Sequence, residues 1–380
     1  MSESGTPRLA IPNLGNYSIA LATAVESLGI EAWWSTATTP TAMKLGREAA
    51  PEAACLPFKA HIGHFIEAAQ SGVEYALMVN SVGTCRLRYY RKLCEQIIED
   101  LGLPIRVFGL GYEGFKPPLV RYFDPPLWPF LRKVRHALVK IGIIDTIELE
   151  TWRLRPLELE PGRTTRLMME CFADLEESRT AKHTLALRED IIERFRQIPI
   201  DQGRETLRAG LIGEISMLRD KTLNHNVEEI LGNMGVSVRN FFLLGAELGN
   251  IFRFASIGNK DTRRHLAKIA APYLKVPVGG HALDSVAHTI RCSRDGYDGM
   301  IHLCPTGCMP ESSVRPILTR VSEDYDIPVL MISFDEHTTA VGVTTRLEAF
   351  VDMLRDRRKR RALRPSDASF QTNSRSKGCA

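Results

Sequence analysis

Three of the eight cysteines in this sequence of 380 residues occupy the same kind of position. Cys55 directly precedes a predicted helix, whereas Cys85 and Cys308 each follow a predicted strand and precede a helix. Backbone N–H groups at the start of a helix are unpaired and carry partial positive charge. Such a setting lowers the pKa of a thiol and favours the thiolate, which is the form that binds metals. These positions therefore predict metal ligation, and they also suit an anionic iron–sulfur cluster.

Two arginines close to Cys85 strengthen this expectation. The side chains of Arg86 and Arg88 would place positive charge beside an anionic cluster. On spacing alone the evidence is thin, because ferredoxins gather their ligands in short cysteine runs and these three cysteines are far apart. A shared site therefore requires a fold that brings the three loops together.

The other thiols are explained more simply. Cys94 lies on the apolar face of a predicted helix, and Cys171 lies in the apolar segment LMMECFADL. Free cysteine behaves as a small apolar residue when it is buried, so we expect both in the core. Cys379 lies near the C-terminal end of the sequence.

The segment FDEHTT, which begins at Phe334, follows the predicted strand VLMIS. Its residues Asp335, Glu336 and His337 are catalytic candidates, because they would lie near the same sheet edge as the cysteines and could exchange protons with a substrate. The alternative is a capping turn, in which an acidic side chain and Thr338 accept hydrogen bonds from the next helix.

Three further motifs each have a simple structural explanation. The segment GGH, Gly279 to His281, could cradle an anion such as a CoA phosphate, or it could form a tight turn. His61 and His64 are expected to pack or to face solvent rather than to bind a metal. The segment GLGYEG resembles a dinucleotide fingerprint, but FKPPLV follows it where that motif needs a helix.

The elements that must position these residues alternate between strands and helices. This pattern predicts an α/β protein with two Rossmann-like, doubly wound lobes, at residues 8–115 and 205–354, joined by a mostly helical middle segment at 116–204. The strand VEYALMVNSV is almost continuously apolar, as in a buried parallel sheet. Within the second lobe, VSVRNFFLLG is read as one strand. Residues 355–380, which begin with RDRRKRR, are predicted to form a basic, disordered tail.

Composition and charge indicate which partners and which cellular compartment to expect. The net charge of +4 is modest, and much of it comes from that tail, so we expect no nucleic-acid partner. The sequence has neither an apolar run of about 18 residues nor the layout of a signal peptide, so we expect a cytoplasmic protein without membrane contact. Disulfides are rare in the cytosol, which leaves metal binding, catalysis or burial to explain the cysteines.

Several blocks of the sequence resemble a known family. The chain is similar to the proteins related to 2-hydroxyacyl-CoA dehydratases, in particular the CoA enzyme activase-related group. The resemblance runs from about residue 11 to 354, and the matching blocks are CLPFKAHIGHFIEAAQSGVEYALM, TCRLRYYRKLCEQIIEDLG, AGLIGEI, VGGHALDSV, CMPE and YDIPVLMISFDEHTTAVGVTTRLEAFVDML. The last block is the most specific, because several rare residues occur together in it.

The resemblance implies a 4Fe–4S cluster held by Cys55, Cys85 and Cys308. It also implies a reductase-like or dehydratase-like enzyme that passes low-potential single electrons to an acyl-CoA or another small molecule. A separate ATP-dependent activator would donate the electrons, and the protein would form a homo- or hetero-dimer. The chain has no P-loop and no signature of an actin-like ATPase, so it is not expected to be that activator.

Cys304 departs from the family pattern, and its role stays open. It could close the cluster as a fourth ligand, bind a second cluster in a double-cubane assembly, or be a thiol buried at the end of a strand. Cys292, at the end of a predicted helix, is a second-cluster candidate. The choice matters, because an open iron can bind a substrate oxygen, whereas a closed cluster mainly transfers electrons. A different class of function is also open: a non-catalytic electron-transfer or assembly module with a structural metal or none.

Overall fold

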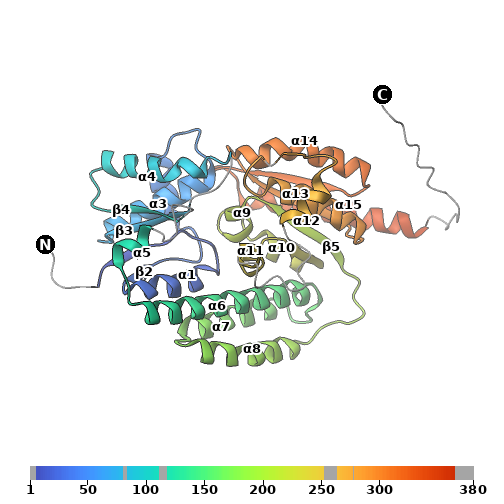
Figure 1. Cartoon of the computed structure of the whole chain (residues 1–380). Helices are drawn as coiled ribbons and strands as arrows, with labels where there is room; N and C mark the ends of the chain where they lie inside the picture. The colour runs from blue at the N-terminus through green and yellow to red at the C-terminus, as the bar shows by residue number, and fades with distance from the viewer. Residues whose placement is uncertain (1–5, 80–83, 111–117, 252–262, 277, 364–380) are drawn as a thin grey trace.

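The computed structural model describes residues 6–79, 84–110, 118–251, 263–276 and 278–363. Within them the chain forms two parallel sheets of four strands each (Figure 1). The first has the order β2-β1-β3-β4 and consists of β1 (Arg8–Ala10), β2 (Glu31–Trp33), β3 (Tyr75–Val79) and β4 (Arg106–Leu110). The second has the order β6-β5-β7-β8 and consists of β5 (Leu207–Gly213), β6 (Val236–Asn240), β7 (Gly299–Pro305) and β8 (Val329–Phe334).

The two sheets share one topology. In each, the second strand in sequence lies outside the first, and the third returns to the opposite side of the first. This reversal is the position at which open α/β sheets bind ligands beyond their carboxyl ends. The predicted α/β fold with two Rossmann-like lobes is confirmed.

Helices flank the sheet of the N-terminal lobe. They are α1 (Ser18–Val25), the 3-10 helix η1 (Glu26–Leu28), α2 (Pro40–Ala49), α3 (Leu56–Gln70), α4 (Leu87–Asp100) and α5 (Pro118–Phe123). The first helical stretch ends at Gly29 as predicted, where a φ of 76° suits glycine. Helices α2 and α3 touch through glycines: a Cβ atom at Gly63 would lie 1.7 Å from the carbonyl oxygen of Ala42.

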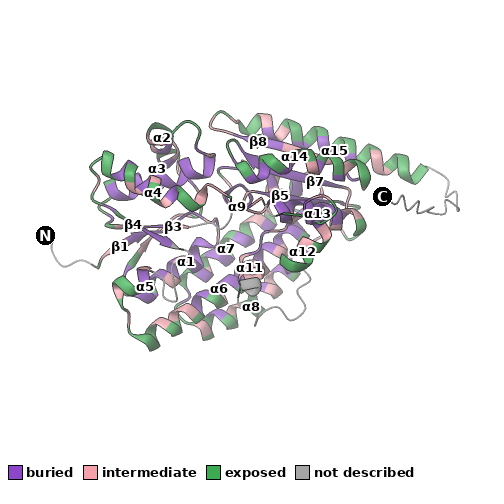
Figure 2. Cartoon of the chain, turned by 45° about the horizontal axis from the view of Figure 1, so that its top comes forward, coloured by how far each residue is buried: buried purple, intermediate pink, exposed green. Residues whose placement is uncertain are grey.

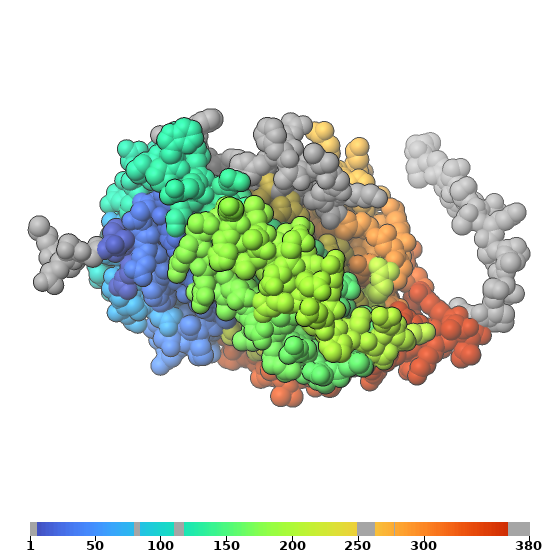
Figure 3. Space-filling view, turned by 90° about the horizontal axis from the view of Figure 1, so that it is seen from below, coloured from blue at the N-terminus to red at the C-terminus, as the bar shows by residue number. Residues whose placement is uncertain are grey.

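The middle segment is helical, as predicted. It contains α6 (Leu127–Leu154), the 3-10 helix η2 (Arg155–Leu157), α7 (Arg163–Glu177) and α8 (Ala181–Arg196). Figure 3 shows these green helices lying across one face of the molecule, between the blue N-terminal lobe and the red end of α15. Their apolar side chains share a core with α1, so the middle segment supports the first lobe directly. Figure 2 colours the buried residues of these helices purple.

The helices of the C-terminal lobe are α9 (Ile215–Arg219), α10 (Val227–Asn233), α11 (Leu244–Ile251), α12 (Arg263–Ala270), α13 (Ala282–Arg294), α14 (Met309–Asp324) and α15 (Ala340–Leu363). The predicted strand VSVRNFFLLG was too long, because β6 ends at Asn240 and Leu244 opens α11. Among the described residues, no helix is long and apolar enough to cross a bilayer.

The predicted tail was wrong for its first residues. Positions 355–363 continue helix α15 instead of forming a disordered segment. Arg358 explains part of this order, because its guanidinium donates to Asp298 at 2.6 Å and to the carbonyl oxygen of Thr206 at 2.9 Å. Arg361 likewise pairs with Asp326 at 2.6 Å. Residues 364–380, with Cys379, lie outside the described residues.

Candidate functional site

The three cysteines of the predicted site stand at the starts of helices. Cys55 is the residue that caps α3, and Cys308 is the residue that caps α14. Cys85 lies one residue before Arg86, which caps α4. Because two of these helices belong to the N-terminal lobe and one to the C-terminal lobe, a shared site requires close approach of the lobes.

Glycine backbones show that this approach occurs. A Cβ atom added to Gly307 would lie 3.3 Å from the Cα atom of Cys55. A Cβ atom at Gly279 would lie 2.8 Å from the backbone nitrogen of Cys85, and one at Gly280 would lie 3.2 Å from Cβ of Pro310. We call these adjoining segments, Cys55, Thr84–Arg86, 278–281 and 307–310, the cysteine junction. It contains backbone from both lobes.

Arg86 links the two sides of the cysteine junction. Its guanidinium donates a hydrogen bond of 3.0 Å to the carbonyl oxygen of Ala53 and a second to the carbonyl oxygen of Gly307. The hydroxyl of Thr84 donates to the carbonyl oxygen of Val278. These contacts give Arg86 a structural role across the lobes, and its role beside a cluster stays a prediction.

The ionisation of the thiols differs from what the sequence predicts. Burial raises the pKa of Cys55 and of Cys308, and the nearby carboxyl group of Glu214 raises both further. The expected lowering was therefore wrong for Cys55 and Cys308, because desolvation of the charged form outweighs the helix dipole. The sulfur of Cys55 also lies 3.4 Å from the hydroxyl of Tyr90.

This donor set fits a metal or cluster chemically. A buried thiol with a raised pKa stays protonated by itself, whereas a coordinated cation removes the proton and compensates the charge. Among the residues that the structure describes, no group of three or more His, Cys, Asp or Glu side chains is arranged to hold a metal ion. The structure thus brings the loops together, and the ligand assignment of Cys55, Cys85 and Cys308 stays a prediction.

Cys304 lies inside the C-terminal lobe. It is a residue of β7 with 2% of its surface exposed. Its sulfur lies 3.7 Å from the hydroxyl of Ser312 and 3.7 Å from the carbonyl oxygen of Pro305. These contacts satisfy the thiol without a metal and favour the strand-end interpretation among the three left open.

The remaining described cysteines are core residues. Cys94, Cys171 and Cys292 are fully buried, and each belongs to a hydrophobic cluster of its own. This confirms the prediction for Cys94 and Cys171. Cys292 packs in the core of the C-terminal lobe, and its role in a second cluster stays a prediction.

The segment FDEHTT forms a turn before α15, and its last residue, Thr339, accepts a hydrogen bond of 3.2 Å from the backbone nitrogen of Gly342 in that helix. A carboxylate oxygen of Asp335 accepts hydrogen bonds of 2.9 Å from the backbone nitrogen of His337 and from the hydroxyl of Thr338. Glu336 forms an ion pair with Lys59 of α3, and His337 is exposed. Asp335 and Glu336 thus have structural partners, and the catalytic role of the three residues stays a prediction.

The other motifs consist of packed histidines and a glycine turn. His61 and His64 are buried in α3, and burial lowers the pKa of each to about 4, so they pack rather than face solvent. The segment 279–281 forms a turn with φ values of 86° at Gly279 and 54° at Gly280. Most of GLGYEG lies outside the described residues.

Sequence reasoning missed Glu214. This residue follows β5 and caps α9, where its carboxylate accepts a hydrogen bond of 3.1 Å from the backbone nitrogen of Met217. Burial raises the pKa of Glu214 to about 7. An acidic residue directly after the apolar strand AGLIG was the available signal, because the carboxyl end of β5 meets that of β7 at the reversal of the sheet.

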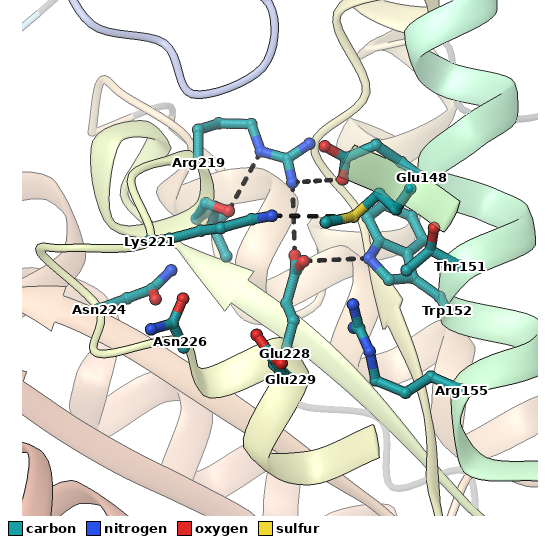
Figure 4. A pocket seen from close by; sticks show the side chains of 12 residues that line it. Glu148, Thr151, Trp152, Arg155, Arg219, Lys221, Asn224, Asn226, Glu228 and Glu229 are labelled. Carbon is teal, nitrogen blue, oxygen red and sulfur yellow. Dashed lines mark hydrogen bonds and ion pairs between the residues drawn. The ribbon is translucent and has the colours of Figure 1, made fainter. Parts of the chain in front are cut away.

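A second contact zone joins the C-terminal lobe to α6 of the middle segment (Figure 4). The guanidinium of Arg219 donates to Glu148 of α6 at 2.9 Å and to Glu228 of α10 at 3.3 Å. The adjacent Asp220 accepts a hydrogen bond of 2.8 Å from the side chain of Asn13, which follows β1. We call these residues the buried network. It joins the C-terminal lobe to both the middle segment and the N-terminal lobe.

Comparison with models of protein families gives a match to this chain. Residues 153–354 match the family described as 2-hydroxyglutaryl-CoA dehydratase, D-component. The chain belongs to this family. No curated protein matched the chain.

The matched range bears on the site directly. It includes the C-terminal lobe with Glu214, Cys304 and Cys308. Cys55 and Cys85 lie before it, so their place in the site rests on the convergence of the loops and on the resemblance of the N-terminal blocks.

Proposed function

We propose that this protein is a component of a dehydratase system for 2-hydroxyacyl-CoA thioesters and holds a 4Fe–4S cluster between its lobes. Family membership supports a dehydratase-component role. The observation that carries the proposal is the convergence of three cysteine-bearing helix starts at the cysteine junction. We also propose that the three sequence-defined parts, 8–115, 116–204 and 205–354, are its structural units.

In this proposal Cys55, Cys85 and Cys308 hold the cluster, and Cys304 stays a buried thiol. When bound, the cluster supplies one-electron transfer, and a separate ATP-dependent activator protein is the electron donor. The chain itself contributes three things: thiol ligands at helix starts, N–H groups that stabilise negative charge, and two lobes that shield the site from water. A donor set of three cysteines would leave one iron without a protein ligand, and that iron could bind a substrate oxygen.

Anaerobic reconstitution tests this proposal. Protein purified without oxygen and supplied with iron and sulfide is expected to be brown, to absorb broadly near 400 nm, and to give a paramagnetic signal after reduction. Cys85→Ala and Cys308→Ala are each expected to lose most of the bound iron. Iron and sulfide counts per chain are the measurement.

Cys94→Ala is the matched control, because Cys94 lies on the helix that follows Cys85 but is buried in the core. It is expected to keep its iron. Full iron retention by Cys85→Ala would remove that residue from the ligand set. A colourless protein that holds zinc, or no metal, would favour the non-catalytic assembly module instead.

A further inference from the structure

A small cavity lies at the carboxyl end of the second sheet, beside the cysteine junction. It has a volume of about 20 Å³ and is bounded by the ends of β5 and β6 and by helices α11 and α13. Its lining includes Phe241, Phe242, Glu247, His281, Asp284 and His288. We call it the end cavity. A space of this volume holds a single group about the size of a water molecule.

Polar atoms in the end cavity lack partners. Among the described residues, neither Oδ1 of Asp284 nor Nδ1 of His288 forms a hydrogen bond, although both atoms are buried and His288 is only 4% exposed. Nearly all buried polar groups in folded proteins are hydrogen-bonded, so unpartnered groups around a cavity point to a missing partner. The cavity is therefore built to receive a polar group.

The charges around the end cavity indicate which kind of chemical group it can bind. Two carboxyl groups, those of Glu247 and Asp284, line it, and within the described residues neither has an ion pair within 4 Å. Burial and then the charge of Glu247 raise the pKa of Asp284 to about 7, while Arg263 lowers it. Arg263 is exposed and donates to the carbonyl oxygen of Gly280 at 3.4 Å.

The histidines add no positive charge to the end cavity at neutral pH. Burial lowers the pKa of His281 to about 4 and that of His288 to about 3. The ring of His288 stacks on Phe241 with centroids 4.2 Å apart, and the ring of His281 meets Phe242 edge-on at 5.4 Å. The cavity thus combines acceptor oxygens with aromatic rings, a set that suits a hydroxyl or ammonium group.

The position of the end cavity connects it to the cysteine junction. His281, which lines the cavity, follows Gly279 and Gly280, whose backbones touch the segments of Cys85 and Cys308. Ser285, also in the lining, donates to Glu311 in the first turn of α14 at 3.1 Å. A ligand held at the junction could therefore extend one end into the cavity.

We propose that the end cavity binds the far end of the substrate's acyl chain and selects a hydrogen-bond-donating terminus, a hydroxyl or an ammonium group, over a carboxylate. This inference rests on the proposed function. The CoA nucleotide is far too large for the cavity, which leaves only the acyl end. A glutaryl chain, as in the family's description, ends in a carboxylate, which the ionised carboxyl groups of Glu247 and Asp284 would repel. This chain is thus expected to act on a non-acidic acyl group.

Three CoA thioesters of 2-hydroxy acids test this proposal. They have equal chain length and end in hydroxyl, ammonium or carboxylate. Calorimetry on the anaerobically reconstituted protein at about pH 8, above the pKa of Asp284, is expected to give a Kd at least about tenfold higher for the carboxylate than for the other two, because like charges are brought together in a half-buried site. Tighter or equal binding of the carboxylate thioester by the unaltered protein would overturn the proposal without any variant.

The double variant Glu247→Gln/Asp284→Asn removes both charges with little change in volume, and the preference is expected to disappear. Glu348→Gln, on the exposed face of α15, is the control and should keep it. An unchanged preference in the folded double variant would overturn the role of the cavity. If the iron-loaded protein binds none of the thioesters, the proposed substrate class itself is wrong. If the reconstituted protein holds no iron, the proposed cluster itself is wrong, and this outcome is distinct from a failure of the end cavity.

Discussion

The two lobes meet in two zones of opposite character. In the buried network, side chains make the contact: Arg219 is enclosed between Glu148 and Glu228, and Asp220 binds Asn13 of the other lobe. In the cysteine junction, the backbone at Gly279 and Gly307 lies against the other lobe, and the side chains of Thr84 and Arg86 donate to backbone carbonyl oxygens there. One zone is filled with mutually satisfied charges. The other brings loops together and leaves thiols between them.

This difference indicates that the two zones have different roles. A buried charge pair with several hydrogen bonds tolerates little displacement, because any separation leaves charges without partners. Glycine backbones allow close approach without filling the space between the loops. The buried network therefore fixes how the lobes sit, and under our proposal the cysteine junction would hold its ligand within that fixed geometry.

The largest effect is expected from Arg219→Met. The change leaves Glu148 and Glu228 without their cation in a buried setting, which typically costs about 3–5 kcal/mol in the free energy of unfolding. Chemical denaturation is the measurement. The control Arg153→Met removes an exposed pair with Glu150, for which a loss of at most about 1 kcal/mol is expected.

The comparison also predicts what Arg219→Met leaves intact. The folded fraction of this variant is expected to bind iron in the same ratio per chain as the unaltered protein, since Arg219 belongs to the buried network. Equal stability of Arg219→Met and Arg153→Met would contradict the stabilising role of the network. A selective loss of iron from folded protein would contradict the separation of the two zones.

Gly279→Ala should affect the cysteine junction instead. Alanine at a φ of 86° is strained by about 1–3 kcal/mol, and its Cβ atom would lie 2.8 Å from the backbone nitrogen of Cys85. We expect the lobes to separate locally and iron binding to weaken. Iron per chain is compared with that of Gly296→Ala, which has a φ of 73° but no atom within 4 Å of the added Cβ.

Gly296→Ala carries the backbone strain without the steric clash. If both variants lose stability but only Gly279→Ala loses iron, contact between the lobes is what holds the site. If the two variants retain iron equally, close approach at Gly279 does not matter for binding.

The fold was more predictable from the sequence than the site. Strands such as GMIHLCP are short apolar runs between turn signals, and β7 is buried along its whole length. The cysteine positions at helix starts were also readable, because they depend only on local order. The direction of the thiol pKa shifts was not, since it depends on burial by both lobes.

The buried network and the end cavity had no local signature at all. Glu148 and Arg219 are 71 residues apart, and nothing in either segment indicates the other. In the tail, by contrast, the sequence signal was misleading. RDRRKRR has the composition of a disordered segment, yet its arginines pair with Asp298 and Asp326, which are distant in the sequence. Charge composition alone does not show which charges will be paired in the fold.

The smallest effect is expected at the edge of the cysteine junction, where Lys59 of the first lobe pairs with Glu336 of the second. Burial alone would raise the pKa of Glu336, but the hydrogen bond from Lys59 and its charge lower it overall. The pair therefore stabilises the protein above the unfolded pKa of glutamate, about 4.3, and this contribution is lost as the pH falls through the lower folded pKa.

Glu336→Gln is accordingly expected to cost about 1 kcal/mol at pH 7, in the range of partly exposed ion pairs. The difference from the unaltered protein should shrink as the pH falls below about 4, where the carboxylate of the unaltered protein becomes protonated. Denaturation at several pH values measures this difference. Because the pair bridges the lobes by side chains, as the buried network does, iron content should change less than in Gly279→Ala. A loss of iron as large as in Gly279→Ala would show that this ion pair, and not the glycine backbone, holds the lobes together at the cysteines.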